Sequence, residues 1–154
     1  MPLGLQPYLS ISAECGGARK AIAWYKEVFG AKVKCAMTMG EDKIGHAELV
    51  FGSNNIMMSD AWPGYAKTPQ ELGGTPITIF IQYPADSKSV YEKAITEGAT
   101  VPEGKEYKEQ PWGWEAGTIV DPFGYQWTVG HDAKGWSDEE TGKQLGMKDI
   151  AGEF

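Results

Sequence analysis

Two side chains that could together abstract a proton stand two positions apart in the segment GHAELVFG. His46 and Glu48 alternate there with Ala47, Leu49 and Phe51, so a strand would place the polar pair on one face and the apolar residues on the other. A carboxylate beside an imidazole raises the pKa of the ring and can make it a general base. The structural alternative is a hydrogen-bonded pair that fixes the strand or a subunit interface. The pattern leaves both interpretations open.

A second group of chemically capable residues, Trp112, Trp114 and Glu115, lies in the segment PWGWE. Two indoles and a carboxylate can hold a planar or cationic molecule by stacking, cation–π contact and ion pairing. The alternative is that the indoles cover the open end of a hydrophobic core. We predict that these three residues contribute to a ligand-binding site.

Four further polar residues fall on the predicted inward faces of two strands. Tyr8 and Ser10 alternate with apolar residues in QPYLSIS, and Thr78 and Gln82 do so in TPITIFIQY. Hydroxyl and amide groups at such positions orient ligands in small-molecule pockets, although they can equally line a hydrated surface without function. We predict a ligand-binding role for all four.

The elements that must position these residues occur twice along the chain. The first set is a strand, a helix closed by Gly30 and three strands, predicted at 6–12, 18–29, 31–39, 45–51 and 55–60. The second set is a strand, a helix ending in Gly98, a strand and a hairpin, predicted at 75–83, 86–98, 99–107 and 113–130. The hairpin turns at Asp-Pro-Phe-Gly, residues 121–124, where Pro fixes φ, Gly supplies a positive φ and Asp bonds its own backbone.

The two sets also share sequence. Residues 18–33 overlay on 86–101 without a gap, which pairs GAKV with GATV. We therefore predict an α+β fold of two βαβββ modules that form curved mixed sheets. The predicted organisation is a first module, a linker rich in Pro and Gly, a second module, and a polar tail with a short capped helix, at 1–60, 61–74, 75–131 and 132–154.

The composition of the chain excludes some classes of binding partner. The chain of 154 residues carries a formal net charge of −7 and contains one arginine, Arg19, so we expect no nucleic-acid and no anionic-membrane partner. Cys15 and Cys35 lack zinc-type spacing and are interpreted as reduced thiols of a cytoplasmic protein. The N-terminal stretch has neither a basic region nor a long apolar run, which predicts a protein without a membrane anchor.

Six segments are typical of one family, namely PYLSI, AIAWYKEVFGAKV, IGHAEL, MMSD, GGT and WGWEAGTIVDPFGYQWTV, at 7–11, 21–33, 44–49, 57–60, 73–75 and 112–129. Together they resemble the vicinal oxygen chelate superfamily, which includes glyoxalase I, bleomycin- and fosfomycin-resistance proteins and extradiol dioxygenases. The similarity is greatest to the PhnB-like group. It implies that each module curls its strands into a cup, that paired cups form a cavity, and that subunits form a homodimer.

The resemblance also implies where a divalent metal would be held. The ligand positions of metal-using relatives fall near Gln6, Met57, Thr78 and Thr128. An amide, a thioether and two hydroxyls are poor ligands for a divalent metal, so we predict no cofactor and no metal, with a displaced site near Asp60 or His131 left open. Glu115 stands where many PhnB-like sequences carry an arginine, which counts against a phosphonate ligand.

These observations predict a metal-independent protein that binds or sequesters a small aromatic or cationic molecule. The alternative is a glyoxalase-like isomerase or lyase in which His46 and Glu48 transfer protons without a metal. A metal-dependent glyoxalase or dioxygenase is a third option, which the four positions above disfavour. Whether the protein is an enzyme is therefore left open by the sequence.

Overall fold

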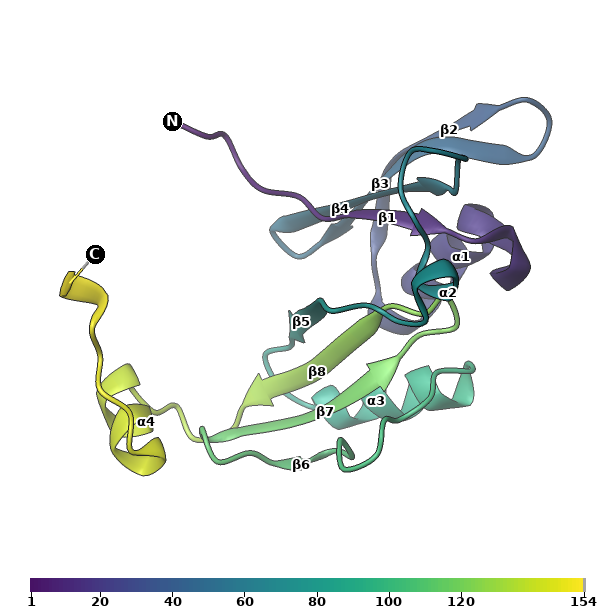
Figure 1. Ribbon diagram of the computed structural model, residues 1–154. Helices are drawn as coiled ribbons and strands as arrows, with labels where there is room; N and C mark the ends of the chain where they lie inside the picture. The colour runs from purple at the N-terminus through teal and green to yellow at the C-terminus, as the bar shows by residue number, and fades with distance from the viewer. Residues whose placement is uncertain (154) are drawn as a thin grey trace. The chain divides into compact units, whose positions relative to one another are not determined.

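The computed structural model describes residues 1–153. These residues contain two four-stranded sheets, each with a helix along one face (Figure 1). The chain divides into two compact units, residues 1–77 with 121–125, and residues 78–120 with the chain from 126 onward. The predicted α+β fold with two βαβββ modules is confirmed.

The first unit orders its strands β1-β4-β3-β2, with the bounds Tyr8–Ile11, Asn54–Asp60, Lys43–Phe51 and Lys32–Met39. β1 pairs with β4 in parallel, and the other neighbours pair antiparallel. One face of the sheet is apolar and packs with helix α1 (Gly17–Phe29); its buried residues include Leu9, Ile11, Ala47, Leu49 and Met58. Because side chains alternate along a strand, the opposite face carries the polar residues.

Helix α1 begins within one residue of its predicted start and ends at its predicted end. Of the residues predicted at helical spacing, Ala18, Ala21, Tyr25 and Phe29 are buried, whereas Ile22 is half-buried. Gly30 follows the helix at φ 70°, the left-handed conformation that is typical of a C′ glycine. The local pattern is therefore sufficient to define this helix.

Asp60, at the end of β4, ties two elements of the first unit together. Its Oδ1 accepts the N–H of Ala18 at 2.8 Å in the first turn of α1, and its Oδ2 accepts the N–H of Ile44 at 2.6 Å. A carboxylate at a helix N-terminus satisfies amides that the helix leaves unpaired. Both oxygens of Asp60 thus have a structural use.

The second unit repeats the topology in the order β5-β8-β7-β6, with the bounds Thr78–Gln82, Gln126–Asp132, Trp114–Val120 and Lys108–Glu109. Helix α3 (Ser87–Thr96) packs against β7 and β8. Gly117 permits this close packing, because a Cβ there would lie 2.6 Å from Cε2 of Tyr91. The face that α3 covers carries the buried Ile119, Trp127 and Val129.

The second unit departs from the sequence prediction at 99–107. Among the described residues of this segment, only Thr100 forms a bridge, to Val120, and the sheet resumes with the short β6. Pro102 has no N–H to donate, and Gly104 adopts φ 73°, so neither residue suits a strand interior. The predicted strand is therefore wrong over most of its length.

Short helical segments complete the structure. Helix α2 (Pro69–Leu72) lies within the predicted linker and begins with a capping box of Thr68 and Glu71. Helix α4 (Asp138–Leu145) confirms the helix predicted in the polar tail, with Ser137 and Glu140 as its capping box. Two 3₁₀ turns are present as well, η1 (Ala13–Cys15) and η2 (Ala151–Glu153).

The turn between β7 and β8, residues 121–125, belongs to the first unit because its side chains form hydrogen bonds with that unit. Asp121 is buried; its Oδ1 accepts the N–H of Phe123 at 2.9 Å and that of Tyr125 at 3.0 Å, and its Oδ2 accepts the hydroxyl of Tyr25 at 2.6 Å. Burial raises the pKa of Tyr125 to about 12. The Tyr125 hydroxyl donates to the carbonyl of Ser10 at 2.8 Å and accepts the N–H of Ser10 at 2.9 Å, which satisfies the open edge of β1.

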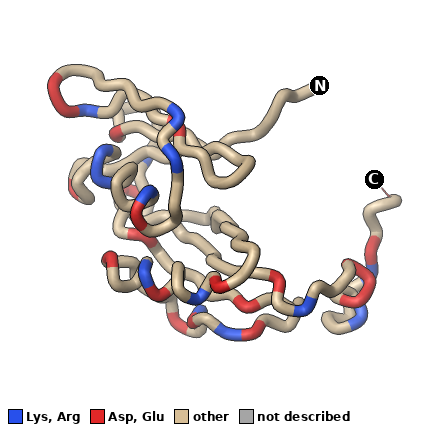
Figure 2. Tube along the Cα trace, turned by 180° about the vertical axis from the view of Figure 1, so that it is seen from behind, with Lys and Arg blue, Asp and Glu red and all other residues tan. Residues whose placement is uncertain are grey.

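Charged residues of both signs are interspersed along the chain of both units (Figure 2), so the net charge of −7 is not confined to one segment. The N-terminal stretch before Glu14 contains no charged side chain. Within residues 1–153, no helix is long and apolar enough to cross a membrane.

Candidate functional site

His46 and Glu48 lie on the face of the first sheet that is opposite the apolar face. The register extends this face across four strands, because Tyr8 pairs with Met57, Met57 with Glu48, and Glu48 with Cys35. Side chains directly opposite each other on adjacent antiparallel strands, such as β2, β3 and β4, have Cβ atoms about 4.5–5.5 Å apart. The face therefore brings together residues from four separate parts of the chain.

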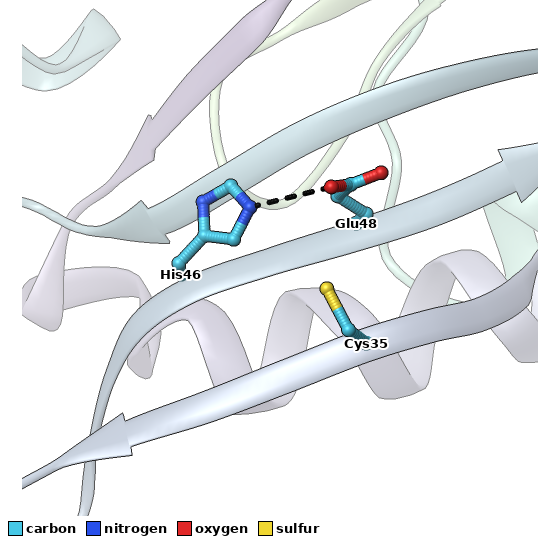
Figure 3. Close-up of side chains that lie close together, drawn as sticks. All are labelled: Cys35, His46 and Glu48. Atoms are coloured by element: carbon cyan, nitrogen blue, oxygen red, sulfur yellow. Dashed lines mark ion pairs between the residues drawn. The ribbon is translucent and has the colours of Figure 1, made fainter.

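The imidazole of His46 lies between a phenol and a carboxylate. The hydroxyl of Tyr8 is 3.3 Å from Nδ1, and Oε1 of Glu48 is 3.7 Å from Nε2 (Figure 3). The side chains of His46 and Glu48 are 27% and 17% exposed, so solvent and small solutes reach them. The structure thus brings three of the sequence-predicted residues together.

Two further side chains hold Glu48. Nζ of Lys34 lies 2.7 Å from Oε2, and Nδ2 of Asn55 donates to the same oxygen at 3.4 Å. The hydrogen bond from Lys34 is the main cause that lowers the pKa of Glu48 from its ordinary value. A carboxylate that is already paired with a lysine gives an imidazole less help as a base, so these contacts do not favour proton transfer by the pair.

Cys35 is also part of this site, although the alternation of residues in the sequence does not predict it there. Its Sγ, a ring nitrogen of His46 and a carboxylate oxygen of Glu48 lie within 4.8 Å of one another, and the sulfur is directed toward the other two side chains (Figure 3). β2 changes register between Val33 and Cys35, and such an irregularity redirects side chains relative to simple alternation. Pairing of β2 with β3 across the turn that follows Met39 could have placed Cys35 opposite Glu48. This pairing can be worked out only if the position of the irregularity is known.

The second sheet bears a pocket of about 470 Å³. Its floor is formed by alternate residues of three strands, Thr78, Phe80, Ala116, Thr118, Gln126 and Thr128. Its wall is formed by the segment 104–112, from which Lys105, Lys108, Gln110 and Trp112 contribute. Since the floor residues alternate with the buried residues that face α3, the pocket lies on the opposite face of the sheet.

The polar groups on the floor of this pocket bond to one another. The hydroxyls of Thr118 and Thr128 are 2.9 Å apart, and Nε2 of Gln126 donates to Oγ1 of Thr78 at 2.5 Å. Among the described lining residues, the charged side chains are those of Lys105 and Lys108. The pocket is therefore uncharged at its floor and positive at its wall.

The structure separates Glu115 from the two indoles that precede it. Trp112 lines the pocket, and Trp114 packs edge-to-face on Phe80, with ring centroids 5.3 Å apart. Glu115 pairs with His131 on the opposite face of the sheet, where its Oε2 is 3.9 Å from Nε2 of the histidine. A molecule in the pocket can thus reach the aromatic rings but is separated from this carboxylate by the sheet.

His131 belongs to a hydrogen-bonded group that joins β8 to the start of α3. Its Nδ1 lies 2.9 Å from Oγ of Ser87 and 3.3 Å from the hydroxyl of Tyr107, and these two hydroxyls are 2.8 Å apart. Ser87 is fully buried, so its hydroxyl is inaccessible to a substrate. The role of this group is structural.

The remaining two sequence-predicted residues lie away from the pocket floor. Ser10 is buried and shares a strand face with Tyr8, and its backbone groups bond to Tyr125. Gln82 is exposed at the end of β5, where it pairs in register with Gly130.

The positions at which the family resemblance places metal ligands do not form a suitable donor set. Met57 offers a thioether, and the hydroxyls of Thr78 and Thr128 already bond to Gln126 and Thr118. Neutral hydroxyls and a thioether are weak ligands for Zn²⁺ or Mn²⁺. The residues present therefore do not fit a divalent metal at these positions.

With its two sheets and its lined pocket, the chain belongs to the Glyoxalase/Bleomycin resistance protein/Dioxygenase superfamily, whose model matches residues 11–129. It is 34% identical over 139 residues to Rv0887c, an uncharacterized protein of Mycobacterium tuberculosis, covering 87% of this chain and 79% of that protein. Among solved structures, protein PA1353 from Pseudomonas aeruginosa has a TM-score of 0.68 at 26% identity, covering 85% of this chain and 98% of that one. A PhnB protein from Bacillus cereus has a TM-score of 0.62 at 14% identity, covering 82% and 98%, which shows the fold alone. The predicted superfamily is thus confirmed.

Proposed function

We propose that this PhnB-like member of the superfamily binds or sequesters a small aromatic molecule in the pocket of the second sheet, and that binding needs no metal. The observation that carries the proposal is the lining of that pocket. Phe80 and Trp112 supply aromatic surface, while hydroxyls and amides supply donors and acceptors. Sites for small molecules have this combination of apolar surface and a few oriented polar groups.

The size of the pocket supports the same conclusion. Pockets that enclose most of a small ligand measure about 300–1,000 Å³, and this one measures about 470 Å³. Phe80 is 49% exposed, so a stacked ligand ring would cover apolar surface that water now contacts. Burial of such surface contributes roughly 25 cal/mol per Å².

The charges of the pocket select between the two ligand classes that the sequence predicts. Lys105 and Lys108 lie at the wall, and they would repel a cation. Glu115, the carboxylate that the sequence predicts for binding a cation, lies on the other face of the sheet. We therefore favour an aromatic ligand that is neutral or carries a negative group, rather than a cationic one.

Fluorescence titration with three naphthalene probes tests this function. A naphthol, a naphthoate and a naphthylmethylammonium ion share one ring system and differ in charge. We expect the wild type to bind the first two more tightly than the third. The substitution Trp112→Ala should weaken binding of the naphthol by about 10-fold, since buried aromatic anchors commonly contribute more than 1 kcal/mol.

Trp62→Ala is the matched control, because Trp62 lies in the segment 61–74 of the first unit, where Lys43 sits over its ring. This variant should bind the probes as the wild type does. Equal weakening by both substitutions, or no binding of any probe by the wild type, would refute the proposal.

A further inference from the structure

We propose that Cys35, His46 and Glu48 form a zinc site on the first sheet. One thiol, one imidazole and one carboxylate converge there from β2 and β3, with ligand atoms within 4.8 Å of one another. Thiolate, imidazole and carboxylate are the side-chain ligands that Zn²⁺ uses in proteins. The site differs from the positions that the family resemblance indicates. Its three residues all belong to the first unit, whereas the residues that line the aromatic pocket belong to the second.

The distances are close to those that a bound ion requires. Zinc–ligand bonds of about 2.0–2.3 Å in a tetrahedron place ligand atoms about 3.3–3.6 Å from one another. Nε2 of His46 and Oε1 of Glu48 are already 3.7 Å apart, which exceeds a hydrogen bond and leaves room for an ion between them. The Cys35 sulfur lies within 4.8 Å of the other two ligand atoms, so a shift of roughly 1 Å would bring it to the third vertex.

Tyr8 supplies the outer contact that zinc-binding histidines commonly make. Its hydroxyl lies 3.3 Å from Nδ1 of His46, so it can accept the proton of that nitrogen. The lone pair then resides on Nε2, the nitrogen that faces Glu48. Partners of this kind fix the tautomer and the orientation of a metal-binding imidazole.

Glu48 is oriented in a similar way. Lys34 and Asn55 both bond to its Oε2, while Oε1 faces the imidazole. One oxygen is therefore held by the protein and the other is directed at the proposed ion. Because Lys34 is 54% exposed at its side chain, it can move toward solvent when a second positive charge arrives.

The donor set determines which ion binds. Sulfur and nitrogen ligands favour Zn²⁺ or Co²⁺ over Mg²⁺ and Ca²⁺, which prefer oxygen. Three protein ligands also leave a fourth position for water or another small molecule, as in zinc sites that carry out chemistry. The partial exposure of His46 and Glu48 gives the ion a route in from solvent.

The test uses the full chain without a polyhistidine tag, kept reduced and freed of metal by a chelator. Zn²⁺ binding is measured by calorimetry, and bound zinc is counted after desalting. Co²⁺ is then added as a spectroscopic probe, because a thiolate ligand gives a charge-transfer band in the near ultraviolet. The variants are Cys35→Ser and His46→Gln, with Cys15→Ser as the matched control, since Cys15 is the other free cysteine of the described chain.

We expect about one zinc per wild-type chain, no retention of Mg²⁺, and a cobalt spectrum with the thiolate band. Cys35→Ser should remove the band and weaken zinc binding by at least about 100-fold, more than the 10- to 100-fold typical of outer-shell partners. Cys15→Ser should leave both unchanged. Absence of zinc binding by the wild type, or a thiolate band that survives Cys35→Ser, would overturn the proposal.

A variant that gains affinity guards against misfolding as an explanation. Lys34→Met removes the positive charge that bonds to Glu48. A unit charge roughly 5 Å from a divalent ion in a solvent-exposed setting changes the affinity by about 15-fold at low salt, and by about 4-fold when physiological salt screens the interaction. Zinc should therefore bind Lys34→Met more tightly than the wild type, and weaker binding would contradict the assigned role of Glu48.

Discussion

The two sheets have the same strand topology, but their polar faces differ in chemistry. The first sheet places Cys35, His46 and Glu48 side by side, all of them able to ionise or to bind a metal. The second sheet places hydroxyls, amides and aromatic rings around its pocket, such as Thr118 and Thr128. A repeated βαβββ unit thus conserves the arrangement of strands while each copy carries its own side-chain chemistry, as expected for a scaffold that hosts unrelated functions.

The register shows how this difference arises. In the first sheet, β3 and β4 pair Glu48 with Met57. The thioether of Met57 does not form an ion pair with the carboxylate, which instead contacts Lys34 of β2. In the second sheet, β7 and β8 pair Thr118 with Thr128, and the two hydroxyls bond to each other. The first arrangement leaves a carboxylate oxygen available to an ion. The second holds two uncharged hydroxyls in fixed positions, where a ligand ring can lie over them.

The largest expected effect is seen when each binding-site variant is tested with both ligands, zinc and the naphthol. Cys35→Ser should lower zinc affinity by at least about 100-fold and leave naphthol binding unchanged, because the cysteine and the pocket lie on different sheets. Trp112→Ala should weaken naphthol binding by about 10-fold and leave zinc affinity unchanged. Calorimetry of both variants with both ligands provides the measurement.

If either substitution weakened the binding of both ligands equally, zinc and the naphthol would share one site. The polar faces of the two sheets would then not have separate functions. Circular dichroism of each variant separates this outcome from a loss of fold. Unfolding would lower the signal of the helices as well as both affinities.

A charge reversal at the wall of the pocket should have a smaller effect. Lys108→Glu replaces one positive charge by a negative one next to the proposed ligand. It should shift the preference between naphthoate and naphthylmethylammonium by roughly 10-fold toward the cation, since two unit charges act through a high dielectric constant, and salt should reduce the shift. Competition titration at low and high salt measures it.

Lys88→Glu changes the net charge of the chain by the same amount and serves as the control. Lys88 lies on α3, where its Nζ is 3.8 Å from Glu92, on the side of the second sheet that the pocket does not occupy. An equal shift in both variants would mean that the total charge, rather than the pocket, selects the ligand.

Features set by neighbours along the chain could be predicted from the sequence. The apolar spacing in α1, the left-handed Gly30 and the capping box at Ser137 each depend on residues within a few positions. The same holds for Asp121, whose side chain bonds to the N–H groups two and four residues later. These local contacts are encoded directly by residue type and spacing.

Features set by pairing between strands could not be predicted in this way. Cys35 reaches the candidate zinc site because of a register irregularity in β2, which alternation alone does not reveal. Pro102 and Gly104 prevent the strand that the pattern of 99–107 suggested. The separation of Trp114 from Glu115 follows from alternation, but only once the bounds of β7 are known.

The smallest expected effect concerns pH, and it distinguishes a face that titrates from one that does not. The hydrogen bond from Lys34 lowers the pKa of Glu48 in the folded chain. A carboxyl group with a lowered folded pKa adds stability at pH values above its unfolded pKa, and this stability is lost as pH falls through the folded pKa. The difference in unfolding midpoint between the wild type and Glu48→Gln should therefore shrink steadily from about pH 6 to about pH 3.

For Thr118→Val the difference should stay constant over this range, because neither hydroxyl of the Thr118–Thr128 pair titrates there. Differential scanning calorimetry of chelator-treated protein measures both series, and a constant difference for Glu48→Gln would show that the ionised pair with Lys34 adds nothing to the stability of the first unit.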